Sequence, residues 1–208
     1  LMDRVVRIKR ELKDVERTRH LQRSNRSRGE VPTVALIGYT NAGKSTLFNR
    51  LTGAGVLSKD MLFATLDPTM RAVTLPSGRR IVLADTVGFI SQLPTELVEA
   101  FKSTLEEVVQ ADLLLHVHDA ASPLVAEEAE DVRAVLVDLG IDEEQQDERL
   151  LSVMNKSDLL EDQDPAREAL GNLFDEGCFT SALSGDGIDT LLAAIDGRLG
   201  KGRRTENL

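Results

Sequence analysis

The stretch Gly38-Tyr39-Thr40-Asn41-Ala42-Gly43-Lys44-Ser45 decides the fold. It reads G-x-x-x-x-G-K-S, the pattern of a phosphate-binding P-loop. Residues 34–37 before it form a short apolar, β-branched run that suits a buried strand, and residues 46–51 after it have apolar positions at helical spacing. A plain turn that matches the pattern by chance is the alternative, but strand, glycine-rich turn and helix together are the context in which this motif binds phosphate.

The residue types of the P-loop explain its chemistry. Glycines let the backbone curl so that successive N–H groups point at phosphate oxygens, and the helix that begins here adds the positive end of its dipole. Lys44 can reach the β- and γ-phosphates as a mobile point charge, and the hydroxyl of Ser45 can bind Mg²⁺.

Length and composition bound the class of protein. A chain of 208 residues is long enough for one full domain and an appendage. The single cysteine, Cys178, excludes an internal disulfide framework and fits a reducing cytosol. No apolar run approaches the ~18–20 residues of a membrane span, and no signal peptide is visible at the start. We therefore expect a cytoplasmic monomer without a membrane partner.

The net charge of −10 is unevenly distributed. Residues 1–30 contain ten Lys or Arg and five Asp or Glu, a net of +5, so the remaining residues carry −15. A basic arm on an acidic body predicts that the arm contacts RNA, with a solvated helix face as the alternative. Residues 1–23 have the apolar spacing of a helix, with the pattern already running at Leu1. We expect residues 1–29 to be a basic helical linker that ends a longer helical region.

Strand and helix patterns alternate through residues 30–200, and residues 201–208 form a polar tail. This alternation predicts an α/β three-layer sandwich: a mostly parallel six-stranded sheet with helices on both faces, preceded by the N-terminal helix. Loops are expected at 57–68 and, as an acidic surface loop, at 142–148. The expected strands are 34–37, 70–75, 79–84, 113–118, 150–154 and 178–180, and the expected later helices are 94–110, 124–139, 165–174 and 188–199.

A second motif, Asp85-Thr86-Val87-Gly88, ends one of these strands. Asp85 can hold Mg²⁺ through a water, and the N–H of Gly88 can approach a γ-phosphate because no side chain obstructs it. A lone D-x-x-G is a weak signal. Here it follows the P-loop at a distance that fits one intervening hairpin.

A third motif, Asn155-Lys156-Ser157-Asp158, indicates which base is bound. Guanine presents two adjacent donors, N1–H and its exocyclic amino group, and the Asp158 carboxylate can accept both. Adenine would leave that carboxylate unpaired, which argues against an ATPase. A backbone N–H of Ser181-Ala182 is expected to bind guanine O6.

His116 and His118 lie two apart, hence on one face of the strand 113–118. A metal pair is conceivable, but no third ligand is evident, so ordinary sheet residues are the favoured interpretation.

Taken together, the motifs resemble those of translation-factor-like GTPases, and of the HflX GTPases in particular. The resemblance covers residues 1 to about 200 and includes the stretches 34–49, 62–69, 85–90, 93–94 and 97–101. It implies GTP and GDP as ligands, Mg²⁺ as cofactor, and Thr65 as the switch threonine that closes over Mg²⁺ and the γ-phosphate. It also implies a partner, the large ribosomal subunit, because HflX proteins act on stalled or stressed ribosomes and can separate the subunits. This sequence differs from the HflX pattern in extent. Of the N-terminal domain that reaches into the ribosome, we expect it to contain only the end of the helical linker.

The expected site follows from the motifs and this resemblance. Lys44, Thr65 and Gly88 are the expected catalytic residues, and Ser45, Thr65 and Asp85 the metal ligands. The nucleotide contacts are Gly38, Tyr39, Thr40, Asn41, Ala42, Gly43, Lys44, Ser45, Thr46, Asp85, Gly88, Asn155, Lys156, Asp158, Ser181 and Ala182.

The residues beside the phosphates leave several alternatives for the rate of hydrolysis. Many GTPases have a water-orienting Gln where this chain has Phe89, so a binding module with negligible hydrolysis is one alternative, and an RNA-binding assembly factor of Obg or Era type is another. Arg71 is the only near candidate for a catalytic arginine. Asn41 resembles the P-loop Asn of potassium-stimulated GTPases, which implies K⁺ beside the phosphates. A hydrogen bond of Asn41 within its own loop is the alternative.

Overall fold

The computed structural model describes residues 31–53, 69–86, 88, 102–161, 164–174 and 177–205, the side chains of 102–104 and 201–205 excepted. The predictions for the basic arm, for the loop that contains Thr65, for Phe89 and for the first part of the helix 94–110 lie outside these residues.

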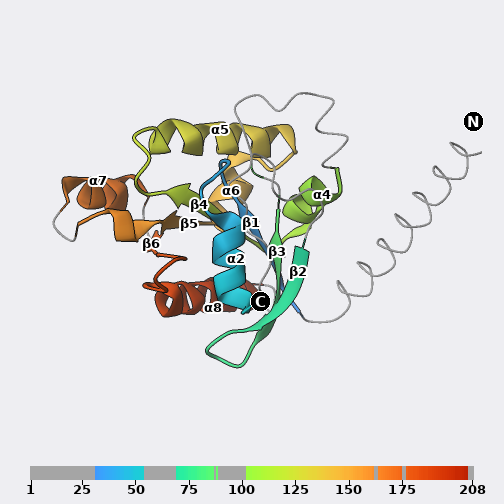
Figure 1. Ribbon diagram of the computed structural model, residues 1–208. Coiled ribbons are helices and arrows are strands. Elements are labelled where there is room, and N and C mark those ends of the chain that lie inside the picture. The colour runs from blue at the N-terminus through green and yellow to red at the C-terminus, as the bar shows by residue number, and fades with distance from the viewer. Residues whose placement is uncertain are drawn as a thin grey trace, which may run out of the picture. The chain divides into compact units, whose positions relative to one another are not determined.

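The body of the molecule, from Pro32 onward, is built on one six-stranded sheet with the order β2-β3-β1-β4-β5-β6 (Figure 1). Neighbouring strands are parallel except for the β2–β3 hairpin, whose turn is closed by a hydrogen bond from Gly78 N–H to Leu75 O. The mostly parallel six-stranded sheet is therefore confirmed. The strands are β1 Thr33–Ile37, β2 Thr69–Thr74, β3 Arg80–Asp85, β4 Leu113–Asp119, β5 Leu150–Asn155 and β6 Cys178–Phe179.

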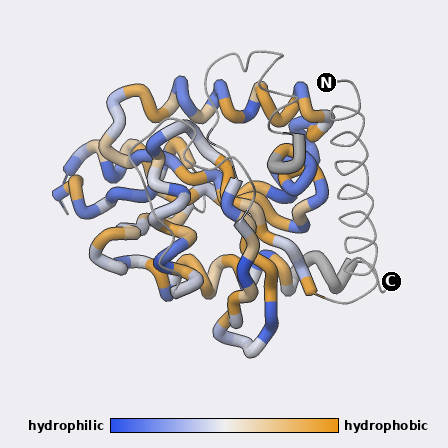
Figure 2. Tube along the Cα trace, turned by 45° about the vertical axis from the view of Figure 1, so that its right-hand side comes forward, coloured by the Kyte–Doolittle hydropathy of each residue, from blue (hydrophilic) through white to orange (hydrophobic). Residues whose placement is uncertain are grey.

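Helices cover both faces of the sheet, and the alternation along β1 shows why. Val34 and Leu36 belong to the core shared with α2 and α8, whereas Ala35 and Ile37 belong to the core shared with α4 and α5. All four side chains are fully buried, as expected for a central parallel strand, and the strands form hydrophobic segments in the interior (Figure 2). The helices are α2 Lys44–Thr52, α4 Lys102–Gln110, α5 Val125–Asp138, α6 Glu143–Arg149, α7 Pro165–Leu173 and α8 Ile188–Thr205, with a 3₁₀ turn η1 at Ser157–Leu159.

The predicted acidic loop at 142–148 is wrong, because this segment forms the helix α6. Asp142 accepts a hydrogen bond from Gln145 N–H (2.9 Å), and the Gln145 side chain accepts one from Asp142 N–H (3.3 Å). This reciprocal capping box satisfies donors that a helix start otherwise leaves unpaired. The sequence did not indicate this helix because the segment has no apolar stripe. The residue that α6 buries is the polar Gln146.

Replacing Asp142 by Ala is expected to lower the free energy of unfolding by about 1 kcal/mol, the usual value of such a cap. Urea denaturation followed by circular dichroism measures it. The control is Asp147→Ala, which removes only an exposed ion pair to Arg133 (3.6 Å) and should change stability by less than about 0.5 kcal/mol. Equal losses in both variants would contradict the role of the cap.

The closing helix is longer than its apolar pattern indicated. We predicted an end at 199 and a polar tail from 201, but α8 continues through Thr205. Arg has a high intrinsic helix propensity, so the residue types at 203 and 204 partly offset the cost of Gly200 and Gly202. None of the helices among the described residues is both long and apolar enough to cross a bilayer.

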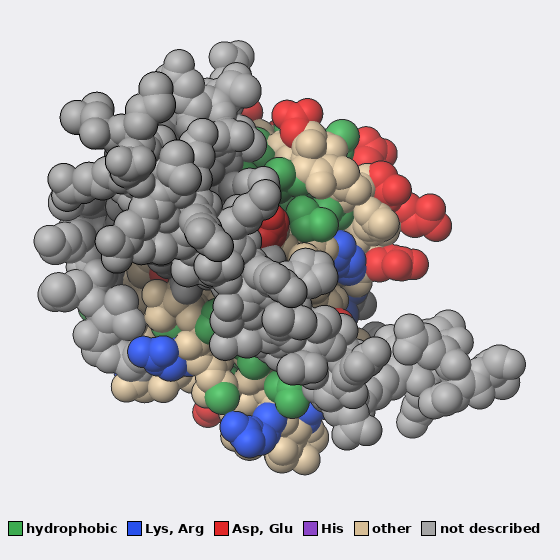
Figure 3. Space-filling view, turned by 90° about the vertical axis from the view of Figure 1, so that its right-hand side faces the viewer, with side chains coloured by type: hydrophobic (Ala, Val, Ile, Leu, Met, Phe, Trp, Pro, Cys, Tyr) green, Lys and Arg blue, Asp and Glu red, His purple; other side chains and the backbone are tan. Residues whose placement is uncertain are grey.

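Acidic side chains are concentrated on α5 and α6, and Figure 3 shows them gathered mainly at the upper right of the face drawn. Most of the Lys and Arg side chains in that view lie lower. The negative charge of the body is thus uneven, with α5 and α6 carrying Glu127, Glu128, Glu130, Asp131, Asp138, Glu143, Glu144, Asp147 and Glu148.

Candidate nucleotide-binding site

The described parts of all three motifs lie at one edge of the sheet. The P-loop follows β1, Asp85 ends β3, Asn155 ends β5, and Ser181-Ala182 follow β6. Because these four strands point the same way in the sheet, their carboxyl ends meet at this edge. Ligands of open α/β sheets bind at such an edge.

Two glycines of the P-loop are required by geometry. Gly38 has φ 146°, and a Cβ placed there would lie 2.2 Å from the carbonyl oxygen of Val117. Gly43 has φ 91°, and a Cβ there would lie 2.3 Å from Nδ2 of Asn155. Both positions combine a backbone conformation that side chains rarely adopt with a clash, so the tight turn before α2 depends on them.

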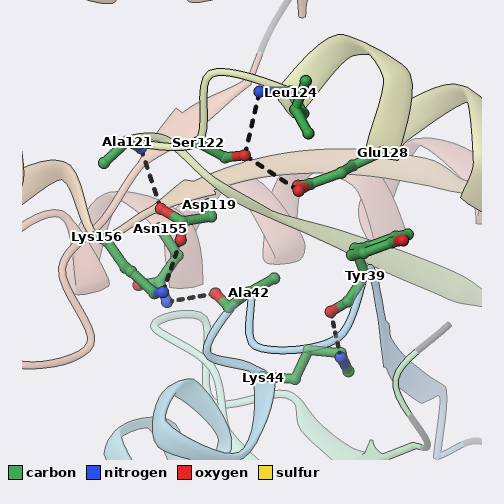
Figure 4. Close-up of polar contacts among 10 residues, drawn as sticks. All are labelled: Tyr39, Ala42, Lys44, Asp119, Ala121, Ser122, Leu124, Glu128, Asn155 and Lys156. Carbon is green, nitrogen blue, oxygen red and sulfur yellow. Dashed lines mark hydrogen bonds and ion pairs between the residues drawn. The ribbon is translucent and has the colours of Figure 1, made fainter. Parts of the chain in front are cut away.

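Lys44 is buried at the start of α2. Its Nζ donates to the carbonyl oxygens of Gly38 (3.1 Å) and Tyr39 (2.9 Å), and Figure 4 shows the second of these contacts. Burial lowers the pKa of Lys44 from 10.5 to about 8, and the charge of Asp85 only partly opposes this. A Cβ on Gly88 would lie 3.1 Å from Nζ, so the backbone of Gly88 lies close to the ammonium group.

Ser45 and Asp85 meet beside Lys44. The hydroxyl of Ser45 donates to Oδ2 of Asp85 across 2.8 Å, and Asp85 is 2% exposed. A hydroxyl and a carboxylate in contact form a set of hard oxygen ligands, the type that Mg²⁺ prefers. Thr65, the third expected ligand, lies outside the described residues.

Asn155 joins two loops of the site. Its Nδ2 donates to the carbonyl oxygen of Ala42 in the P-loop (3.0 Å), and its Oδ1 accepts from the N–H of Ala182 (3.0 Å). Figure 4 shows the link to Ala42. We expected Asn155 to contact the nucleotide, and in this structure its side chain connects the phosphate loop to the loop after β6.

Lys156 is held by a residue that sequence reasoning missed. Its Nζ contacts Oδ2 of Asp119 at 2.6 Å (Figure 4), and its backbone adopts the left-handed conformation with φ 62°. Asp119 ends β4 at the same sheet edge as the motifs. The sequence did contain a signal for Asp119. It is a carboxylate at the end of a predicted strand, the same kind of position that the three motifs occupy.

Asp158 is exposed, and no described residue forms a hydrogen bond or ion pair with it. Its carboxylate is therefore accessible to a base. The predicted backbone donors are engaged differently, because Ser181 N–H donates to Asp186 O (2.9 Å) and Ala182 N–H donates to Asn155. A contact from either N–H to guanine O6 thus requires an exchange or sharing of these bonds.

Asn41 is exposed and left-handed, with φ 61°. Asn tolerates this conformation better than most residues. The left-handed backbone is therefore sufficient to explain an Asn at position 41, whether or not its side chain also helps to hold K⁺.

His116 and His118 lie on β4, on the face of the sheet that α5 and α7 cover. Their rings are 3.9 Å apart, and the ring of His118 lies 4.2 Å from that of Phe174. Burial lowers the pKa of His116 well below 6.5 and that of His118 to about 3, so both are neutral. Among the described residues, no group of three His, Cys, Asp or Glu side chains could hold a metal ion.

These neutral histidines predict acid sensitivity. Below pH 6.5 His118 becomes protonated in the unfolded chain, whereas in the folded chain it stays neutral down to about pH 3. The free energy of unfolding therefore falls as pH decreases through this window. From pH 6.5 to pH 5, His118 alone accounts for about 2 kcal/mol. Urea denaturation at pH 8 and pH 5 measures the loss. His118→Phe should reduce the loss by about this amount, with His116 contributing to what remains. An unchanged profile in this variant would contradict the assignment.

The comparisons with known proteins agree with this geometry. Residues 33–156 match the family described as 50S ribosome-binding GTPase. The chain is 52% identical over 201 residues to a GTPase HflX from Magnetococcus marinus and 48% identical over 199 residues to GTPase HflX from Escherichia coli. These alignments cover 97% and 96% of this chain but 45% and 46% of the relatives, so the chain spans just under half of their length.

Solved structures share the fold. A GTP-binding protein from Sulfolobus solfataricus in complex with GDP has a TM-score of 0.61 and 28% identity, covering 89% of this chain and 58% of that one. Aquifex aeolicus Era, at TM-score 0.63 and 23% identity, covers 80% of this chain and 56% of its own and shows the fold alone. The family match over more than half of the chain is decisive. The chain belongs to the family of 50S ribosome-binding GTPases, and the resemblance of its sequence to the HflX GTPases is confirmed.

Proposed function

We propose that this domain binds GTP and GDP, hydrolyses GTP, and uses its nucleotide state to gate association with the large ribosomal subunit. The observation that carries the proposal is the single edge at which the P-loop, Asp85 and the accessible carboxylate of Asp158 meet. The names of the HflX relatives and of the matched family support the reaction and the partner.

The residues present fit Mg²⁺. Ser45 and Asp85 would hold the ion, and Thr65 would complete the set by family resemblance. When bound, Mg²⁺ neutralises charge on the β- and γ-phosphate oxygens. Lys44 adds a second positive charge at the P-loop, and Gly88 has no side chain that would crowd its ammonium group.

The acidic helices orient the proposed complex. RNA phosphates are repelled by a surface as negative as that of α5 and α6, so we infer that this side faces away from ribosomal RNA. The basic arm, residues 1–30, carries a net positive charge and is the segment proposed to bind RNA. Order and disorder of the loop around Thr65 and of the segment after Gly88 would be the switch.

Slow hydrolysis is expected from the domain alone, because Phe89 cannot orient a water. Adding purified large subunits should accelerate phosphate release by at least about 100-fold, since a supplied transition-state charge is worth roughly 10³–10⁵ in rate. Phosphate release from GTP, with small subunits as the control, measures this effect. Fast turnover without subunits, or no response to them, would contradict the proposal.

The same assay tests K⁺. If Asn41 helps to hold K⁺ beside the phosphates, the rate should be higher in KCl than in NaCl, and Asn41→Gly should remove the difference. Glycine is the suitable replacement because it accepts the φ of 61° without strain. Equal rates in the two salts would leave Asn41 with only its backbone role.

A further inference from the structure

The loop after β6 depends on polar contacts beyond Ala182. Leu183 is 76% exposed, so its side chain contributes little packing. Gly185 and Gly187 follow with φ of 98° and 72°, and glycine loses more conformational freedom on ordering than other residues. A segment of this kind is held in one conformation mainly by hydrogen bonds to its backbone.

Arg50 supplies such bonds from α2. Its Nε donates to the carbonyl oxygen of Ala182 (2.9 Å), and its Nη2 donates to the carbonyl oxygen of Leu183. A Cβ on Gly185 would lie 3.5 Å from Nη1, so the loop also packs against the guanidinium group. Ala182 is thereby held on both sides, by Asn155 at its N–H and by Arg50 at its carbonyl.

The position of Arg50 in α2 connects this loop to the phosphate subsite. Lys44 begins the helix, and Arg50 lies six residues further, about 9 Å along the axis. Asn155 provides the second connection, from Ala182 back to Ala42. Helix α2 and the side-chain amide of Asn155 together fix the distance between the groups proposed to bind phosphate and those proposed to bind the base.

We propose that Arg50 is a positioning residue for nucleotide recognition, which holds the Ala182–Leu183 backbone at the spacing from the P-loop that one guanine nucleotide requires. The inference rests on the proposed guanine-nucleotide binding and adds a residue that no motif contains. A loop held in place before binding loses less entropy when the base arrives, so the effect is on affinity for ligands that carry the base.

The experiment compares GDP with inorganic tripolyphosphate, which carries phosphates but no base. Arg50→Met should weaken GDP about tenfold and leave the tripolyphosphate affinity within about twofold of the unmodified chain. Arg50→Lys should recover part of the GDP affinity, because an ammonium group still donates to a carbonyl. Calorimetric titration gives both affinities, and thermal unfolding without ligand reports stability separately.

Arg149→Met is the matched control. Arg149 also donates to backbone carbonyls, those of Val108, Val109 and Ala111 at the end of α4, and its contacts lie outside the motifs. It should lower stability and leave the ratio of the two affinities unchanged.

The outcomes separate the two proposals. An Arg50→Met chain that loses both ligands equally, or neither, while the unmodified chain prefers GDP, would overturn the role of Arg50 alone. An unmodified chain that binds GDP no better than tripolyphosphate would overturn guanine recognition, and the positioning role with it.

Discussion

Asp158→Asn is expected to weaken GDP binding by at least about 100-fold and to transfer the preference to xanthosine diphosphate. The amide oxygen can still accept guanine N1–H, but the amide NH₂ then faces the exocyclic amino group of guanine, donor against donor. Buried polar mismatches of this kind discriminate by up to roughly 10⁴–10⁵. Xanthine carries a carbonyl at C2, which an amide N–H can bind. Asp158 is exposed and has no partner among the described residues, so the fold should not change.

Competition between GDP and xanthosine diphosphate for a fluorescent nucleotide measures this shift. The control is Asp138→Asn, which removes the same charge from an exposed position at the end of α5. If Asp138→Asn weakens GDP as much as Asp158→Asn does, the effect is one of net charge, and the assignment of the base contact is wrong.

Lys44→Met is expected to abolish measurable triphosphate binding and at the same time to stabilise the ligand-free domain. Burial costs the ammonium group free energy, as its pKa of about 8 shows. The shift from 10.5 sets an upper limit of about 3 kcal/mol on this gain, and the loss of the hydrogen bonds to Gly38 and Tyr39 reduces it. The two effects have opposite signs because the charge serves the ligand and not the core.

The pH dependence gives an internal check. The unfolded chain holds the Lys44 proton up to about pH 10.5, whereas the fold releases it from about pH 8. Stability of the unmodified, ligand-free chain should therefore rise through this window, and that of Lys44→Met should not. Lys156→Met is the comparison, because it loses an ion pair to Asp119 and should give no stabilisation. A destabilised Lys44→Met chain would contradict the account.

The fold and the positions of the motifs could be predicted because β1, β4 and β5 are each marked by a short apolar run in the sequence itself. Apolar runs such as Leu113–Val117 identify central strands, and the motif residues follow them directly. The helix α6 was missed because its signal is a pair of polar caps, Asp142 and Gln145, on a segment without an apolar stripe. The extension of α8 depends on weak propensities that the two glycines obscure.

Contacts between distant segments could not be read from the pattern. Asn155 bonds to Ala42 across 113 positions, and Arg50 bonds to Ala182 across 132. Neither pairing has a local signature, since each joins segments that only the tertiary fold brings together. The same holds for Asp119, whose role depends on the left-handed backbone of Lys156.

The central claim is that this domain is specific for guanine nucleotides. Calorimetric titration of the unmodified chain with GDP and with ADP, in the same Mg²⁺ buffer, tests it most directly. The account predicts micromolar-range binding of GDP and at least about 10³-fold weaker binding of ADP, because adenine leaves Asp158 unpaired. Equal affinities for the two nucleotides would contradict it.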